Sequence, residues 1–436
     1  MPPKGRDSTG VGYSEIHHCR ICGSSNLVKI LDLGLQALTG VFPKSLEELV
    51  PTAPLSLMKC MHVGTRSACG LVQLRHSYEG SELYGSTYGY RSGLNASMVA
   101  HLHATAQRVK QTVLLRPGDV VLDIGSNDGT FLRAMREPGV LLVGMDPTGS
   151  KFGDFYPADI QLISEFFSAD RFRTETHRNH AKAVTSIAMF YDLENPLEFM
   201  RQVEEILVDD GIWLFEQSYL PRMLGTTSYD TVCHEHLEYY ALRPILYMAE
   251  RSGLKIIDVE LNNVNGGSFS IIAAKLGSKY TVNSEVLDRI LREESDLGLD
   301  SLRVFDEFAT RVVEHRTQIR QFFTEARHAD LRVFGYGAST KGNVLLQYCG
   351  VTPSEMACIA DVNQDKHGAF TPGTRIPIVS EEEARRRGPD VYFVLPWHFR
   401  DHIVKREEAF LEAGHRIVFP LPQLEAVTLA ESTYHR

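Results

Sequence analysis

The 436-residue sequence predicts an α/β protein in which two open, mostly parallel sheets follow a small metal-binding domain. A short apolar run leads into a glycine turn and a helix start at residues 120–130, and the same pattern recurs at residues 331–342. Four cysteines gather near the N-terminus, where they look like metal ligands in a reducing cytosol rather than disulfide partners. These observations indicate three successive folded units.

The first glycine turn lies in Val120-Val-Leu-Asp-Ile-Gly-Ser-Asn-Asp-Gly-Thr130. Its glycines allow a tight turn and let a ligand approach the backbone, and the helix that starts at Thr130 offers free N–H groups to the same ligand. The next apolar run ends at Asp146, about 20 residues on, where open α/β sheets place the acid that binds a ribose. Asn127 and Asp128 replace the phosphate-approach positions of a dinucleotide turn, so we expect S-adenosylmethionine. An incidental strand–turn–helix is the alternative. The predicted cofactor contacts are Asp123, Gly125, Ser126, Asn127, Asp128, Gly129 and Asp146.

Composition and charge narrow the class of protein. The chain is 43% hydrophobic and 23% charged, as in ordinary globular proteins, and it has a net charge of −10 that argues against a nucleic-acid partner. No apolar run approaches the roughly 18 residues of a membrane helix. Residues 1–16 contain no apolar signal core and are expected to form a disordered tail. We therefore expect a cytoplasmic protein, a monomer or weak oligomer, that acts on a small molecule.

The cysteine cluster predicts a zinc site in residues 17–80. Cys19-Arg-Ile-Cys22 forms a knuckle, and Cys60 and Cys69 supply two further thiolates. Eight residues separate Cys60 from Cys69, which is wider than usual, so His62 is a competing fourth ligand and a degraded site is the alternative. Four protein ligands leave no open coordination position, so this zinc should be structural.

Residues 81–280 alternate predicted strands and helices and end in a hairpin across Asn265-Gly-Gly267, which predicts a mostly parallel sheet with one reversed strand. Residues 281–328 predict a helical linker, with residues 292–294 and 314–316 on solvated faces. Residues 329–436 predict a second Rossmann-like domain. Its glycine turn places Ser339, Thr340 and Lys341 where a helix start could hold a phosphate, although a purely structural loop is the alternative.

The most reactive side chains lie in Glu216–Tyr219 and in the segment Ser228–Tyr240, which includes His234-Glu235-His236. It follows a predicted strand, on the sheet edge that carries the first glycine turn. Its histidines are not spaced as in a metalloprotease helix, and they fit a general base with an orienting carboxylate better. A polar loop whose histidines only cap backbone groups is the alternative.

Taken together, these motifs resemble the nucleotide-sugar C-methyltransferases. These are class I methyltransferases that use S-adenosylmethionine to methylate C3 of nucleotide-linked 4-keto-6-deoxyhexoses. The resemblance runs from Cys19 onward and implies that His236 is the base that generates an enolate, with Glu235 supporting it and His234 structural or secondary. It also implies that the C-terminal domain contacts the nucleotide sugar, and that the segment of Tyr88, Tyr90 and Ser92 reaches into the cofactor cleft. The expected substrate contacts are Tyr336, Ser339, Thr340 and Lys341.

Two departures from the family pattern bear on the substrate. Cys233 stands where the family has a tyrosine before His-Glu-His, and Met189-Phe190-Tyr191 stands where it often has a histidine. A thiol is a weak donor, so Tyr229 or Tyr219 would have to take the tyrosine's role, or the acceptor differs. The alternative functions are a methyltransferase of another small-molecule carbon or oxygen, an RNA methyltransferase, and a silent scaffold.

Overall fold

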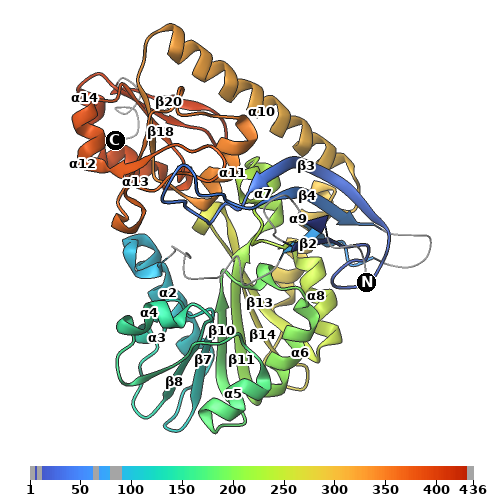
Figure 1. The fold of residues 1–436 in the computed structure, drawn as a ribbon. Coiled ribbons are helices and arrows are strands. Elements are labelled where there is room, and N and C mark those ends of the chain that lie inside the picture. Colours follow the sequence, from blue (N-terminus) through green and yellow to red (C-terminus); the bar gives the residue numbers. More distant parts are fainter. Residues whose placement is uncertain (1–4, 7–11, 62–67, 79–90, 430–436) are drawn as a thin grey trace.

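The computed structural model describes residues 5–6, 12–61, 68–78 and 91–429, which form four sheets (Figure 1). Tyr88, Tyr90 and His62 lie outside the described residues. No helix in the described part of the chain is long and apolar enough to cross a membrane.

The central sheet has the class I methyltransferase arrangement, as predicted. Its strand order is β13-β14-β11-β10-β7-β8-β9, and β14 alone among these strands is antiparallel to its neighbours. The strand order reverses between β7 and β10, so the turn after β7 lies at the switch point where such sheets bind ligands. The strands are β7 Val120–Ile124, β8 Leu141–Met145, β9 Ile160–Ile163, β10 Ala181–Ile187, β11 Leu207–Ser218, β13 Leu254–Asn262 and β14 Ser268–Lys275.

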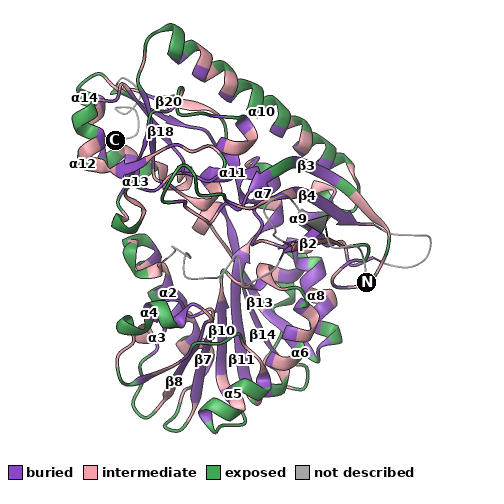
Figure 2. Ribbon diagram, in the orientation of Figure 1, coloured by how far each residue is buried: buried purple, intermediate pink, exposed green. Residues whose placement is uncertain are grey.

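Helices cover both faces of this sheet, and its strands are buried between them (Figure 2). Strand β7 shows why a continuous apolar run predicts such a strand: Val121 packs on the face under α2 and α3, whereas Val120 and Leu122 pack on the face under α5, α6 and α8. The helices of this domain are α2 Ala96–Thr112, α3 Thr130–Ala134, α4 Gly149–Phe152, α5 Ala169–Thr176, α6 Pro196–Ile206, α7 Leu220–Gly225 and α8 Leu242–Arg251.

The N-terminal domain contains two small antiparallel sheets. The first has the order β1-β2-β6, with β1 Gly5–Arg6, β2 Gly12–Glu15 and β6 His76–Tyr78. Residues 12–15, which were predicted to be disordered, thus form a strand because they pair with β6. The second sheet has the order β12-β5-β4-β3, with β3 Leu27–Ala37, β4 Thr52–Cys60, β5 Val72–Leu74 and β12 Glu238–Tyr239. Strand β12 comes from the methyltransferase domain, directly after His236, so the two domains share this sheet.

The predicted linker forms α9 (Ser284–Leu297) and α10 (Arg303–His328), which runs from the N-terminal domain to the C-terminal domain (Figure 1). Apolar side chains three and four residues apart form its buried stripe, which packs against β3, α7 and α11. Two groups expected on solvated faces are buried instead: Glu294 accepts the Tyr219 hydroxyl (2.9 Å), and His315 lies 2.5 Å from the carbonyl oxygen of Pro420. This segment is therefore a scaffold rather than a spacer.

The C-terminal domain has the predicted second α/β sheet, in the order β17-β16-β15-β18-β19-β20, with only β20 antiparallel among its strands. Its strands are β15 Val333–Tyr336, β16 Ile359–Asp361, β17 Ile378–Ser380, β18 Val391–Val394, β19 Arg416–Phe419 and β20 Glu425–Val427. Its helices are α11 Thr340–Cys349, α12 Glu381–Arg387, α13 Arg400–Arg406 and α14 Glu408–Glu412.

The end of β3 contacts the C-terminal domain through side-chain amides. Gln347 of α11 accepts the Ala37 N–H (2.7 Å) and donates to the Ala37 carbonyl (3.1 Å), and Asn343 donates to the carbonyl of Thr39 (2.8 Å). Asn343 is fully buried. The N-terminal domain is thus held to both of the larger domains.

Candidate active site

The turn after β7 leaves no room for side chains at its two glycines. Gly125 and Gly129 adopt left-handed backbone angles, with φ of 74° and 70°. A Cβ on Gly125 would lie 3.0 Å from Met189 Cγ, and one on Gly129 would lie 3.1 Å from the Tyr156 ring. Met189 and Tyr156 fill the space beside the two glycines, so the close packing and the left-handed angles of this turn both require glycine. Contact of S-adenosylmethionine with this turn stays a prediction.

Asp146 follows β8 and is fastened to the same turn. Its Oδ2 atom accepts the Asn127 N–H (2.8 Å), and its Oδ1 atom accepts the N–H (2.7 Å) and the hydroxyl (2.5 Å) of Thr148. A carboxylate has about four lone-pair sites, so Asp146 keeps capacity for a ribose hydroxyl. Its position at the sheet edge fits the predicted role.

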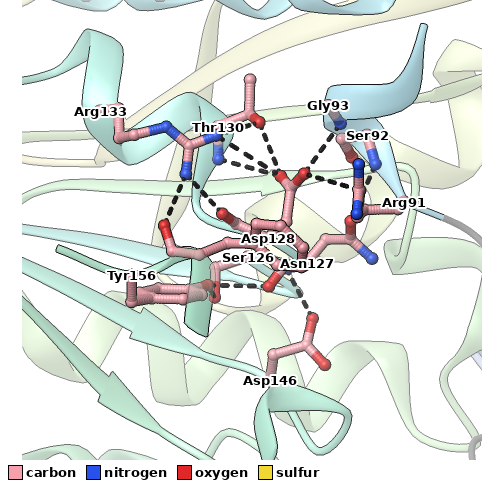
Figure 3. A network of polar contacts seen from close by, with 11 residues as sticks. Arg91, Ser92, Gly93, Ser126, Asn127, Asp128, Thr130, Arg133, Asp146 and Tyr156 are labelled. Carbon is pink, nitrogen blue, oxygen red and sulfur yellow. Dashed lines mark hydrogen bonds and ion pairs between the residues drawn. The ribbon is translucent and has the colours of Figure 1, made fainter. Parts of the chain in front are cut away.

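The side chains of Asn127 and Asp128 point to the segment before α2 (Figure 3). Asn127 Oδ1 accepts the Ser92 N–H and Asp128 Oδ2 accepts the Gly93 N–H, each at 2.9 Å. Asp128 Oδ1 also accepts the Thr130 hydroxyl (2.6 Å). These two side chains, which were expected to contact the cofactor, thus dock the short helix η1 (Ser92–Leu94) onto the turn. Ser92 joins the site through its backbone.

Tyr156 is a part of the turn that the sequence did not suggest. Its hydroxyl lies 2.8 Å from Ser126 Oγ and 3.0 Å from the Asn127 carbonyl oxygen (Figure 3). Beneath the turn, Asp123 accepts the Thr185 hydroxyl (2.6 Å), and burial raises the pKa of Asp123 to about 7 against that hydrogen bond. Ser126 and Asp123 were both predicted to contact the cofactor. In the structure their hydrogen bonds hold the turn to Tyr156 and to Thr185.

Two residues of the His-Glu-His segment anchor it to the N-terminal domain. The His234 ring is 0% exposed, lies edge-on to Tyr78, and has its Nε2 atom 3.2 Å from the Ala53 carbonyl oxygen. Glu235 accepts the Thr39 hydroxyl at 3.3 Å. Burial lowers the pKa of His234 to about 4 and raises the pKa of Glu235. His234 is therefore placed for a structural role, and Glu235 is directed at Thr39 rather than at His236.

His236 is oriented by a backbone carbonyl instead. Its Nδ1 atom lies 3.0 Å from the carbonyl oxygen of Thr231, so Nδ1 carries the hydrogen and Nε2 is the nitrogen that can accept a proton. The ring also packs against Tyr191, with 4.2 Å between ring centroids. Burial, and then the positive charge of Lys341, lower the pKa of His236 to about 3, so the imidazole is neutral at neutral pH. The neutral Nε2 atom can accept a proton, and the lowered pKa also makes this ring a weaker base than a free imidazole.

The tyrosines proposed as substitutes for the family tyrosine lie in the core. Tyr229 is fully buried, and its hydroxyl is 3.0 Å from His315 Nδ1 and 3.5 Å from Cys349 Sγ. Tyr219 donates to Glu294. Burial raises the pKa of Tyr229 well above its ordinary value. The Tyr229 hydroxyl is bound between α10 and α11, and its expected catalytic role stays a prediction.

The expected substrate residues of the C-terminal domain divide into two groups. Tyr336 belongs to the core, because its hydroxyl donates to the buried Glu407 (3.0 Å). Ser339 accepts the Gly342 N–H (3.0 Å) and caps α11, whose first residue is Thr340. Lys341 points toward the methyltransferase domain, where its Nζ atom donates to the Asn265 carbonyl (3.0 Å). Contact of these residues with a phosphate stays a prediction.

Asp230 lies beside this lysine and was not predicted. It belongs to the short helix η4 (Tyr229–Thr231), and its Oδ2 atom accepts the indole N–H of Trp397 (2.9 Å). Burial raises the pKa of Asp230, whereas Lys341 and the Trp397 hydrogen bond oppose that change. Its place four residues before His234 was the one sequence signal that could have suggested it.

Glu216, which belongs to a predicted reactive segment, pairs at the end of β11 with His101, which was not predicted. His101 of α2 has its Nε2 atom 2.5 Å from Glu216 Oε1, and Asn262 donates to Glu216 Oε2 (2.9 Å). Burial lowers the pKa of His101, but the Glu216 carboxylate outweighs burial, so the net pKa is raised. The pair joins α2 to the carboxyl edge of the sheet.

The four predicted zinc ligands come together. The Sγ atoms of Cys19, Cys22, Cys60 and Cys69 all lie within 4.8 Å of one another, and the closest pairs are 3.4 and 3.5 Å apart. Tetrahedral zinc with Zn–S distances of about 2.3 Å holds its sulfurs about 3.8 Å apart, so this cluster fits the ion. The β3–β4 hairpin delivers Cys60 to the knuckle, because Leu27 pairs with Cys60.

The chain matches three family models: a zinc binding domain over residues 19–84, a methyltransferase domain over residues 98–259, and a C-methyltransferase C-terminal domain over residues 263–422. It is 31% identical over 421 residues to the C-methyltransferase NovU of Streptomyces niveus. The matched region covers 96% of this chain and 98% of NovU.

Two solved methyltransferase structures resemble part of the chain. One is a chain of the complex between the Haloferax volcanii Trm112 methyltransferase activator and a methyltransferase, with 14% identity and a TM-score of 0.33 over 42% of this chain and 94% of that chain. The other is the CcbJ methyltransferase from Streptomyces caelestis, with 14% identity and a TM-score of 0.32 over 40% of this chain and 89% of that chain. Likenesses this remote carry no functional argument. On its near full-length match to NovU, the chain belongs to the C-methyltransferase family and is an S-adenosylmethionine-dependent enzyme with a zinc-binding domain.

Proposed function

We propose that this enzyme methylates C3 of a nucleotide-linked 4-keto-6-deoxy sugar, through an enolate that His236 generates. The observation that carries the proposal is the hydrogen bond from His236 Nδ1 to the Thr231 carbonyl, which leaves Nε2 as the basic atom. A saturated carbon next to a ketone becomes nucleophilic only after its proton has been removed, whereas an amine already has a lone pair. An oriented neutral imidazole therefore supports carbon as the acceptor atom.

In the proposed reaction, a ketone at C4 acidifies the hydrogen on C3. His236 Nε2 takes this proton, and the C–H electron pair becomes the C3=C4 double bond of the enolate. Thr231 holds the imidazole in the tautomer that can accept the proton. When bound at the β7 turn, S-adenosylmethionine supplies the electrophilic methyl group. The protein contributes position, proton removal and stabilisation of the enolate oxygen.

The C-terminal domain is the proposed site for the nucleotide sugar. Its sheet presents the turn at Gly337–Ser339 and the start of α11 at the carboxyl ends of its strands, on the side where Lys341 reaches the methyltransferase domain. We further propose a small-molecule acceptor, no nucleic-acid partner and a cytoplasmic reaction, in keeping with the net charge of −10. Another small-molecule carbon or oxygen is the alternative acceptor.

The test is an acceptor panel incubated with S-adenosylmethionine. Nucleotide-linked 4-keto-6-deoxy sugars should gain one methyl group by mass spectrometry, and carbon–proton correlation spectra should place it on C3. The matched control is the same nucleotide sugar with a hydroxyl at C4, which cannot form the enolate and should stay unmethylated. Methylation of that control, or turnover of only non-sugar acceptors, would contradict the proposal.

A further inference from the structure

Lys341 lies at a junction of three segments from two domains. Its Nζ atom donates to the carbonyl of Asn265 in the short helix η5 (Val264–Gly266). On one side of the junction, α11 packs directly against η4, which carries Asp230. On the other side, a Cβ on Gly266 would touch the Trp397 ring at 3.4 Å, and Trp397 in turn donates to Asp230. Lys341 thus lies where η4, η5 and the segment of Trp397 meet.

Two buried polar atoms at this junction have no hydrogen-bond partner among the described residues. Asp230 is 1% exposed, and its Oδ1 atom has no hydrogen-bond partner among the described residues. The Nδ1 atom of His398, on the 3-10 helix that contains Trp397, is buried and unpartnered in the same sense. Buried polar groups without partners are costly and rare, so these atoms indicate a place where a bound molecule completes the hydrogen bonding.

The ammonium also lies near the proposed base. His236 is held by the carbonyl of Thr231 in η4, the element that packs against α11, and the positive charge of Lys341 lowers the pKa values of both His236 and His398. One of the three ammonium hydrogens is engaged by Asn265, so two remain for a ligand. Lys341 can therefore bind the molecule from which His236 removes a proton.

We infer that Lys341 holds the oxygen of the enolate, that the Asn265 carbonyl aims its ammonium, and that Asp230 is a positioning residue whose charge keeps the ammonium protonated. The inference rests on the proposed function. As the C3 proton moves to His236 Nε2, negative charge collects on the C4 oxygen, and a hydrogen bond from Lys341 Nζ stabilises it there. The lysine keeps its proton throughout. When the enolate carbon bonds to the methyl group, the C4 carbonyl reforms and the charge leaves the oxygen.

This role differs from the phosphate contact that the sequence predicts for Lys341. A phosphate at the start of α11 would lie by Ser339 and the first N–H groups of the helix. The lysine side chain instead leaves that helix start and crosses to the Asn265 carbonyl of the methyltransferase domain. The two roles also differ in their kinetics, because an enolate contact is made in the transition state and a phosphate contact equally in the ground state.

The test compares Lys341→Met with the parent enzyme, and with Lys405→Met as a control at an exposed position of the same domain. At saturating acceptor, Lys341→Met should lower kcat by about a hundredfold or more, the usual effect of removing one oxyanion donor. It should lower equally the exchange of the C3 proton with deuterated water, measured with S-adenosylhomocysteine in place of the methyl donor. Calorimetric affinity for S-adenosylhomocysteine should not change, which also shows that the variant is folded.

A raised acceptor KM in Lys341→Met, with normal kcat and normal exchange of the C3 proton, would overturn the inference. It would indicate that Lys341 binds a phosphate of the acceptor. Normal exchange with lost methyl transfer would also overturn the inference. If the parent enzyme methylates no keto sugar, the proposed function has failed instead, so the two failures are distinguishable.

Asp230→Asn gives an independent readout, because it keeps an acceptor for Trp397 and removes the charge. The groups that face Lys341 are Asp230, Cys233, His236 and His398. Burial lowers the pKa of Lys341, and the charge of Asp230 opposes this. Without that charge the Lys341 ammonium should lose its proton at a lower pH. On the alkaline side, the activity of Asp230→Asn should therefore begin to fall at a lower pH than that of the parent. An unchanged alkaline pH dependence in a variant with normal cofactor affinity would overturn the inference, even if Lys341→Met fails to fold.

Discussion

Asp146 and Asp361 occupy equivalent positions in the two α/β domains. Asp146 accepts the N–H of Asn127 in the turn after β7 (2.8 Å), and Asp361 accepts the N–H of Ala338 in the turn after β15 (2.7 Å). Both domains thus fasten the acid that ends the second strand to the glycine turn that follows the first. They differ in charge, because Lys366 lies 3.8 Å from Asp361 and also holds the Ala338 carbonyl (2.7 Å).

This equivalence provides a matched pair of substitutions. Asp146→Ala should weaken the binding of S-adenosylhomocysteine several-fold or more in calorimetry, because the ribose hydroxyls lose an acceptor. Asp361→Ala removes the same kind of carboxylate from the other domain, so it should leave cofactor affinity unchanged and raise the acceptor KM. Equal cofactor affinity in the parent and Asp146→Ala would place the cofactor elsewhere.

The zinc cluster should bind one ion per chain. Metal analysis of protein purified without added zinc should find it, and Cys19→Ser should lose it and unfold at lower temperature, because structural zinc contributes directly to folding. Cys358→Ser is the control, since Cys358 is also a free, buried cysteine but is not part of the cluster. Equal zinc content in the parent and Cys19→Ser would refute the site, and loss of zinc in His62→Ala but not in Cys69→Ser would reassign the fourth ligand.

His236→Ala should lower kcat by about a hundredfold or more with cofactor binding intact, because this is the usual effect of losing a general base. Exchange of the acceptor's C3 proton with deuterated water should stop as well. Glu235→Gln should cost less, since Glu235 contacts Thr39 and not the His236 ring. Near-normal turnover in His236→Ala, with an inactive His101→Ala, would move the base to the His101–Glu216 pair.

Burial of His234 should make stability depend on pH. Its pKa is about 4 in the folded protein and about 6.5 when exposed, so the unfolded chain binds a proton that the folded chain does not between these values. Stability is therefore lost as pH falls through this window, by about 1.4 kcal/mol per pH unit.

His234→Phe removes this contribution. Between about pH 7.5 and about pH 5, its free energy of unfolding should fall by about 2 kcal/mol less than that of the parent. Chemical denaturation at both pH values measures the difference. An identical pH dependence of the two proteins would show that another group carries the titration.

Local patterns predicted the features that neighbouring residues determine. The glycine turn, the zinc cysteines and the mostly parallel sheet with one reversed strand follow from glycine positions, the cysteine knuckle and apolar runs. The directions of His234, Glu235 and Tyr229 could not be predicted, because their partners Ala53, Thr39 and His315 are distant in sequence. The motif shows that these side chains are polar and adjacent, but only tertiary packing decides which of them face the substrate.

Helix α10 shows the same limit. Its apolar stripe was readable from the sequence, but charge alone placed His315 on a solvated face. In the structure this ring is buried, because the Pro420 carbonyl and the Tyr229 hydroxyl satisfy its two nitrogens. Burial of a polar side chain therefore depends on partners that its own helix does not contain.

The amide contacts of Asn343 and Gln347 with Ala37 and Thr39 limit how this enzyme can be recombined with its relatives. A chimera that takes only the C-terminal domain from a relative would lose these hydrogen bonds to the backbone of Ala37 and Thr39. The loss would lie next to the hydrogen bond between the Thr39 hydroxyl and Glu235. The C-terminal domain is therefore not an independently exchangeable module. An engineered or natural crossover that keeps activity should transfer the end of β3 together with α11.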